Sequence, residues 1–193
     1  HLINEIGAWI LQESCRFCSR MISAGHALIR VAVNVSPRQL AAADFIEVVQ
    51  SAIESASIEP GRLVFVFPVC VFIETMAESV EKLVLLKNLG VHVTLDDFGT
   101  GYSSLTYLRN LPVETLKIDK SFIDRIAEDE TQASLIASII EMSHVLGLTV
   151  VAEGVETNEQ LQRLRECQCD MFQGYIASRP LPEPEAAKLL KPD

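Results

Sequence analysis

The stretch Val91–Gly101 reads V-H-V-T-L-D-D-F-G-T-G and joins a short apolar run to two acidic residues and a glycine-rich turn. Its first five residues are typical of a buried β-strand, and Asp96 and Asp97 stand where that strand ends. The same order recurs along the chain: an apolar run, then polar residues, then a helical pattern. This repetition predicts a parallel sheet covered by helices.

The pattern extends in both directions from Val91. A helix is predicted over 3–24, and strands are predicted at 29–35, 63–67, 91–95, 115–118, 148–152 and around Met171. A last helix is expected at 182–190. No glycine-rich phosphate turn follows the first strand, which argues against a dinucleotide-binding doubly wound domain. A (β/α)8 barrel needs about eight units and typically some 250 residues, so we expect one or two N-terminal strands to lie outside these 193 residues.

Composition favours a folded protein with a discrete site. The chain is 49% hydrophobic and carries a net charge of -10, which opposes binding to nucleic-acid polymers or anionic membranes. No apolar run approaches the roughly 20 residues of a membrane span and no signal peptide opens the chain, so a cytoplasmic domain without membrane contact is expected. The pairs Cys15-x-x-Cys18 and Cys167-x-Cys169 predict reduced thiols, with a zinc site as the less favoured alternative.

Polar side chains stand at or just past the C-terminal ends of most predicted strands. They are Asn34, Asp96, Asp97, Lys117, Asp119, Glu153 and Gln173. In a barrel these strand ends meet at one mouth. Carboxylate and amide oxygens suit Mg2+ or Mn2+, and a lysine among them suits a phosphate or a metal-activated water. The pattern therefore predicts phosphate chemistry at this mouth.

Individually, these residues also have structural explanations. Asn34 or Ser36 could cap the helix that follows them, and Lys117 and Asp119 could form a solvated pair. Glu153 could stand at a helix start, where acids are favoured. Their shared position at strand ends favours a functional site, because clustered charges are costly to bury without a metal or ligand.

Five motifs together carry a resemblance to a known family. They are N-V-S at Asn34, D-D-F-G-T-G-Y-S-S-L at Asp96, L-K-I-D at Leu116, A-E-G-V-E-T at Ala152 and Q-G-Y at Gln173. In this order they resemble the EAL domain family of bacterial cyclic di-GMP phosphodiesterases, over essentially the whole chain. The resemblance implies a modified TIM (β/α)8 barrel, a single EAL-like domain over 1–193 that lacks its N-terminal strands, and a mouth that binds cyclic di-GMP.

The resemblance also implies roles for particular residues. Complete members use two Mg2+ or Mn2+ ions to direct water onto one phosphodiester, which gives linear pGpG. The matching metal positions are Asn34, Asp96, Asp97 and Glu153. The matching catalytic positions are Lys117, which orients water and phosphate, and Glu153. Further ligand-binding positions are Asp119, Glu156 and Gln173. Arg38 in N-V-S-P-R-Q-L is a separate candidate for a phosphate or guanine contact.

Two features of the family are missing from the sequence. The E-A-L strand is absent, and L-V-F-V-F-P-V-C at Leu63–Cys70 stands where members have a pattern like L-E-L-E-I-T-E-S. Val66 takes the place of a glutamate that binds metal in the family. Val69 takes the place of a second glutamate, which anchors the loop 99–104. Valine offers no oxygen to a cation, so we expect weak metal binding and a loss of several orders of magnitude in hydrolysis.

The resulting hypothesis is a degenerate EAL domain, similar to receptor-type members such as FimX and LapD. It would bind cyclic di-GMP with little or no hydrolysis and pass the signal to a neighbouring signalling domain or protein partner. Two alternatives stay open: a metal-dependent phosphodiesterase in which another acid such as Glu74 compensates for Val66, and a nucleotide-independent interaction module. A homodimer through the helix after D-D-F-G-T-G is also compatible with the resemblance.

Overall fold

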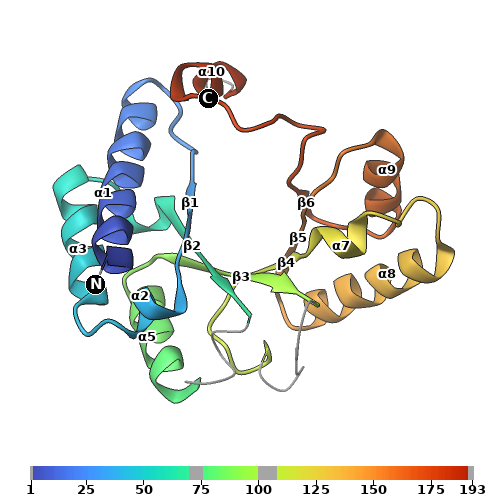
Figure 1. Ribbon diagram of the computed structural model, residues 1–193, viewed down its shortest axis with the longest axis horizontal. Helices are drawn as coiled ribbons and strands as arrows, with labels where there is room; N and C mark the ends of the chain where they lie inside the picture. Colours follow the sequence, from blue (N-terminus) through green and yellow to red (C-terminus); the bar gives the residue numbers. More distant parts are fainter. Residues whose placement is uncertain (1, 70–75, 100–107, 191–193) are drawn as a thin grey trace. The chain divides into compact units, whose positions relative to one another are not determined.

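The computed structural model describes residues 2–69, 76–99 and 108–190. They form two compact units, the first made of His1–Val93 with Leu181–Asp193 and the second of Thr94–Pro180. In each unit parallel strands are covered by helices (Figure 1). None of the described helices is both long enough and apolar enough to cross a bilayer.

The first unit begins with a long helix and contains two paired strands. Its elements are α1 (Leu2–Ser23), β1 (Val31–Asn34), α2 (Pro37–Ala41), α3 (Phe45–Ala56), the 3-10 helix η1 (Pro60–Arg62), β2 (Leu63–Pro68), α5 (Met76–Asn88) and α10 (Glu183–Leu189). β1 and β2 are parallel, with Val31 opposite Leu63 and Asn34 opposite Val66. α1 and α3 lie side by side and cover this strand pair (Figure 1).

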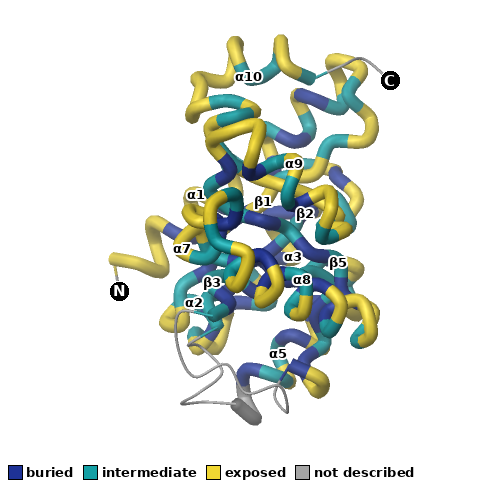
Figure 2. The backbone as a smooth tube through the Cα atoms, turned by 90° about the vertical axis from the view of Figure 1, so that its right-hand side faces the viewer, coloured by how far each residue is buried: buried dark blue, intermediate teal, exposed yellow. Residues whose placement is uncertain are grey.

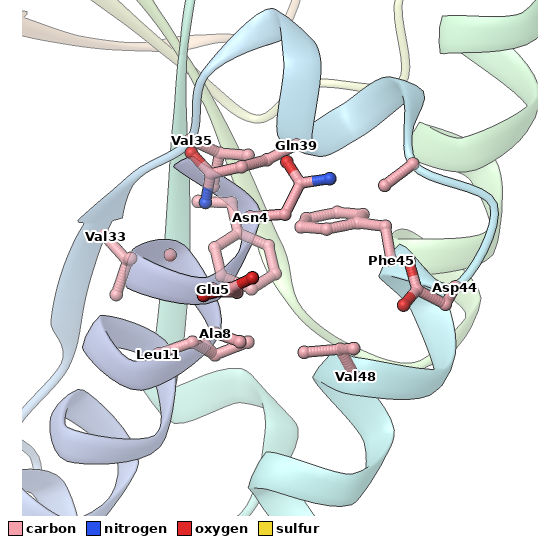
Figure 3. Close-up of a pocket in the computed structure, with 13 residues that line it drawn as sticks. Asn4, Glu5, Ala8, Leu11, Val33, Val35, Gln39, Asp44, Phe45 and Val48 are labelled. Carbon is pink, nitrogen blue, oxygen red and sulfur yellow. The ribbon is translucent and has the colours of Figure 1, made fainter. Parts of the chain in front are cut away.

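Aromatic side chains fill part of the core of this unit. The fully buried ring of Phe65 lies 6.0 Å from that of Phe45 and 6.3 Å from that of Phe67. Such pairs contribute about 0.5–1.5 kcal/mol each beyond their burial. A pocket of about 200 Å³ opens beside Phe45 and Phe65, and it contains none of the residues predicted above for the site (Figure 3).

The second unit continues the alternation of strands and helices. β3 (His92–Phe98) enters it from the first unit, followed by β4 (Thr115–Ile118), α7 (Lys120–Ile123), α8 (Glu130–Val145), β5 (Thr149–Ala152), α9 (Asn158–Glu166) and β6 (Met171–Phe172). Neighbouring strands from β3 to β6 pair in parallel and in chain order. Side chains from β4, β5 and α8, including Ile118, Val150 and Ile136, form the buried core of this unit. Figure 2 colours each residue by its burial, and the residues of β5 alternate between intermediate and buried.

Helix starts follow the capping signals in the sequence. Ser36, and not Asn34, caps α2: the Ser36 hydroxyl accepts from Gln39 N at 3.3 Å, and the Gln39 side chain accepts from Ser36 N at 3.0 Å. Thr157 and Gln160 form the same reciprocal box at α9. Each box satisfies backbone donors that the first helical turn leaves free.

Candidate functional site

The end of β3 supplies two neighbouring carboxylates to one place. Successive residues of a regular strand point to opposite faces of the sheet. Here the register with β4 shifts between Leu95 and Phe98, and Asp97 has a φ of +56°, in the left-handed region. This irregularity re-aims the side chains. As a result, oxygens of Asp96, Asp97 and Glu153 all lie within 4.8 Å of one another.

Lys117 lies among these acids. It is 9% exposed and stands in β4 between the fully buried Leu116 and Ile118. Its Nζ lies 3.1 Å from Asp96 Oδ1 and in close contact with Glu153 Oε1, at the end of β5. A buried lysine needs such partners. The pairing explains how β4 can carry a charged residue inside the sheet, and it replaces the solvated pair of Lys117 with Asp119 that was considered from the sequence.

The charges in this cluster shift one another's protonation. Burial alone would lower the pKa of Lys117, but its hydrogen bond to Glu153 and the charges of Glu153 and Asp96 raise it above the ordinary value. Burial raises the pKa of Glu153, although Lys117 opposes that rise. Burial and the neighbouring charges of Asp96 and Asp119 also raise the pKa of Asp97. Three carboxylates facing one ammonium leave a negative site that attracts a cation or a proton.

The acidic oxygens fit a divalent cation. Asp96 Oδ1 is buried and accepts no hydrogen bond of good geometry, although the Lys117 ammonium lies 3.1 Å away. A buried carboxylate oxygen with spare acceptor capacity, close to two other carboxylates, suits Mg2+ or Mn2+. In the described part of the chain, these three acids are also the one group of histidine, cysteine and acidic side chains arranged for a metal. The described cysteines form no zinc group and are free thiols.

The remaining predicted residues of the second unit surround this cluster. Asp119 caps α7 by accepting from Ser121 N at 3.0 Å. Gln173 is held at the end of β6 by its backbone N, which donates to Ala152 O at 2.8 Å. Its side chain and Glu156 line a pocket of about 330 Å³ together with Glu153.

Sequence reasoning missed two side chains of this pocket. Its full lining is Lys120, Glu153, Gly154, Glu156, Gln173, Gly174 and Tyr175. Lys120 directly follows L-K-I-D, and Tyr175 ends Q-G-Y, so each stood beside a motif already singled out. Arg179 stacks on the ring of Tyr175, with its guanidinium carbon 4.7 Å from the ring centre.

The other predicted residues belong to the first unit. Asn34 is exposed at the end of β1 and Arg38 is exposed in α2, so their ligand roles stay predictions. Val66, opposite Asn34, is 3% exposed. Glu74, the loop residues 100–104 and the proposed dimer helix after them lie outside the described residues.

Comparison with known proteins agrees with the geometry. The family model described as "EAL domain" matches residues 1–180. The chain belongs to the EAL domain family. It is 41% identical over 181 residues to the cyclic di-GMP phosphodiesterase NbdA of Pseudomonas aeruginosa, covering 94% of this chain and 23% of NbdA. The chain thus spans about a quarter of the length of this curated relative.

Solved EAL structures share the fold. The PaMucR phosphodiesterase in complex with c-di-GMP has a TM-score of 0.91 at 38% identity, over 96% of this chain and 75% of that one. The Klebsiella pneumoniae BlrP1 manganese/cy-diGMP complex has a TM-score of 0.85 at 25% identity, over 93% and 45% of the two chains. The predicted parallel α/β, TIM-barrel-like fold class is confirmed. This EAL domain is a module of the kind found in cyclic di-GMP signalling proteins.

Proposed function

We propose that this EAL domain is a cyclic di-GMP receptor with little or no hydrolytic activity, similar to FimX and LapD. It binds the dinucleotide and passes the signal to a neighbouring domain or a protein partner. The observation that carries the proposal is Val66, a buried valine in β2 opposite Asn34, the last residue of β1. The family motif has a metal-binding glutamate at this position, and valine has no oxygen to offer a cation.

Ligand recognition is supported by what the second unit keeps. Lys117 is ion-paired with Asp96 and Glu153, and Glu153 reaches from that cluster into the pocket that Gln173 also lines. A pocket lined by a few convergent polar groups, one of them a carboxyl whose pKa is raised by burial, is typical of a ligand site. Two named relatives in structure are complexes with c-di-GMP, which favours that dinucleotide as the ligand.

A metal-dependent phosphodiesterase that gives pGpG is the second candidate. The observation in its favour is the acidic group itself: Asp96, Asp97 and Glu153 would hold Mg2+ or Mn2+, because one oxygen of each lies within 4.8 Å of the others. A bound divalent cation would polarise the phosphodiester and lower the pKa of a water. Lys117 would keep Glu153 in place and set a positive charge beside the phosphate. The two candidates share a ligand and differ in turnover.

One incubation separates these candidates. The whole protein that contains this domain is mixed with cyclic di-GMP and either Mg2+ or Mn2+, and bound nucleotide, intact nucleotide and pGpG are quantified in the same samples. Nucleotide that is bound and stays intact supports the receptor. Rapid, metal-dependent formation of pGpG overturns it in favour of the enzyme. If the protein neither binds nor cleaves the nucleotide, the receptor and the enzyme are both overturned, and the nucleotide-independent interaction module remains.

A control variant shows whether any product comes from this domain. Asp96→Asn with Asp97→Asn removes two of the three clustered carboxylates while keeping side-chain size. Product that persists in this variant arises elsewhere in the protein or from a contaminant. Product that disappears arises from the EAL site.

A further inference from the structure

Lys120 connects two segments at the wall of the Glu153 pocket. It is the first residue of α7, and its Nζ lies 2.7 Å from Asp124 Oδ1 in the next turn of the chain. The same Nζ donates to Glu156 Oε1 at 3.1 Å, on the segment that follows β5. Lys120, Glu153 and Glu156 all line the pocket. One ammonium therefore fixes one of the two pocket carboxylates.

The methylene chain of Lys120 is held in place as well as its ammonium group. Gly154 has a φ of +68°, and a Cβ added there would lie 2.4 Å from Lys120 Cγ. The methylene groups of Lys120 thus lie against the backbone directly after Glu153. An isolated surface ion pair contributes little, partly because two long side chains must be ordered. Here packing on Gly154 already orders the lysine, so its charge has a defined position.

The position of the Lys120 ammonium matters because the other charged residues that line the pocket are acidic. Its lining carries the carboxylates of Glu153 and Glu156 and a single cationic residue, Lys120. Lys117 does not line the pocket and is committed to Asp96 and Glu153. Arg179 stacks on Tyr175 but is not part of the lining. Two carboxylates facing an anionic ligand repel it, and the repulsion is strong where water is partly excluded.

We propose that Lys120 is the positioning and charge-compensating residue that lets this pocket accept an anionic dinucleotide. It holds the Glu156 carboxylate at the wall and offsets its negative charge, so that Glu156 does not repel the ligand's phosphates. This inference rests on the proposed binding of cyclic di-GMP, and it assigns Lys120 an action through Glu156 and not a direct contact with phosphate.

Lys120→Met tests the role, because methionine keeps an unbranched stem against Gly154 and loses the charge. In the whole protein at low salt, we expect the affinity for cyclic di-GMP to fall about tenfold, and the loss to narrow to about twofold near 1 M salt, where charges are screened. Lys120→Arg should keep the affinity within about threefold. Lys188→Met, on the exposed side of α10, is the control with the same change in net charge and should change nothing.

A second background separates positioning from direct contact. When Glu156 is already replaced by Gln, Lys120→Met should cost less than about twofold, because the charge that Lys120 compensates is gone. A tenfold loss in both backgrounds overturns the proposal and makes Lys120 a direct phosphate ligand. Equal melting temperatures of the variants, within about 2 °C, show that the fold is intact.

The outcome for the unmodified protein keeps this proposal distinct from the function on which it rests. If the unmodified protein binds cyclic di-GMP and Lys120→Met binds equally well at low salt, only the role of Lys120 is overturned. If the unmodified protein binds no cyclic di-GMP, the proposed function fails and this inference fails with it.

Discussion

Asn34, the last residue of β1, lies opposite Val66 of the parallel strand β2, where the pairing of the two strands ends. The Val35 amide donates to Val66 O at 2.9 Å, so the backbone of both strand ends is fixed by the ladder. Residues in register on neighbouring strands project from the same face of a sheet. Val66 therefore lies on an ordered scaffold, and the metal ligand that we propose is missing at this position can be restored by changing one side chain.

Val66→Glu should create a cation site beside Asn34. Because Val66 is buried, an unpaired carboxylate there should lower the free energy of unfolding by about 2–3 kcal/mol without metal. Bound Mn2+ would neutralise the new charge, so we expect Mn2+ affinity to rise at least about tenfold and the lost stability to return with metal. Calorimetric Mn2+ titration and denaturant unfolding with and without Mn2+ measure both effects.

Val64→Glu is the matched control for this change. It adds the same charge two residues earlier in β2, opposite Ala32 and not Asn34. We expect it to leave Mn2+ affinity unchanged. Equal gains in Mn2+ affinity from the two variants would show that the effect is one of net charge and not of position.

Lys117→Met should destabilise the fold by removing the cation from among three carboxylates. Breaking a buried ion pair costs about 3–5 kcal/mol, and partial exposure of Asp96 and Glu153 reduces this to about 2–3 kcal/mol here. Mg2+ or Mn2+ should restore part of the stability by taking the place of the lysine charge. Urea unfolding with and without Mg2+ checks this expectation, and a variant as stable as the unmodified protein would contradict it.

The pH dependence of the cluster has a definite sign. The pKa of Glu153 is raised above its ordinary value by burial, so the folded state holds this proton more tightly than the unfolded state does. The contribution of protonated Glu153 to the free energy of unfolding is fully present below the pKa that Glu153 has in the unfolded chain. It is lost as pH rises through the pKa of Glu153 in the folded state. Without metal, Glu153→Gln should therefore gain stability relative to the unmodified protein as pH rises from about 4 to 7. A difference that stays constant over this range would contradict the assignment.

The alternation of apolar runs and polar strand ends accounts for most of what could be predicted. β4 has the predicted bounds, because a short apolar run between polar residues allows one strand and one register. β3 runs on to Phe98, past its predicted end at Leu95, since a register shift lets a strand carry Asp96 and Asp97. The predicted start at 29 was too early, as β1 begins at Val31.

Within the site, strand-end reasoning brought together the residues whose position depends on the strands alone. Asp96, Lys117 and Glu153 do meet. Lys120 was missed because its place in the pocket depends on the left-handed backbone at Gly154. The motif E-G-V-E does not indicate which side chain packs against this glycine. Conformations of this kind are set by tertiary contacts and not by local periodicity.

Two glycine substitutions separate backbone strain from the contact with Lys120. Gly147 and Gly154 both have positive φ, but a Cβ at Gly147 would meet nothing within 4 Å, whereas one at Gly154 would strike the Lys120 side chain. Gly147→Ala should lower the free energy of unfolding by about 1–2 kcal/mol from strain alone. Gly154→Ala should cost more and should also weaken cyclic di-GMP binding. Unfolding curves and cyclic di-GMP titrations of both variants test this expectation. Equal losses of stability and equal affinities in the two variants would mean that Lys120 moves aside without consequence.

Asp170 ties the start of β5 to the end of α8, and its removal should cost stability in a pH-dependent way. One oxygen, Oδ2, accepts from Val150 N at 2.7 Å and lies 2.9 Å from His144 Nε2. Burial alone would raise the pKa of Asp170, but these two contacts lower it below its ordinary value.

The stabilisation by ionised Asp170 is present above the pKa that Asp170 has in the unfolded chain. It is lost as pH falls through the pKa of Asp170 in the folded state. Asp170→Asn keeps an acceptor for Val150 and loses the charge, so it should cost about 0.5–1 kcal/mol at pH 7, because the pair is partly exposed. Asp170→Ala loses both and should cost about 2 kcal/mol. Urea unfolding between pH 7 and pH 3 tests this: the cost of the Asn variant should shrink toward the acid end while that of the Ala variant persists. An Asn variant whose cost is the same at both ends would show that the charge of Asp170 contributes nothing.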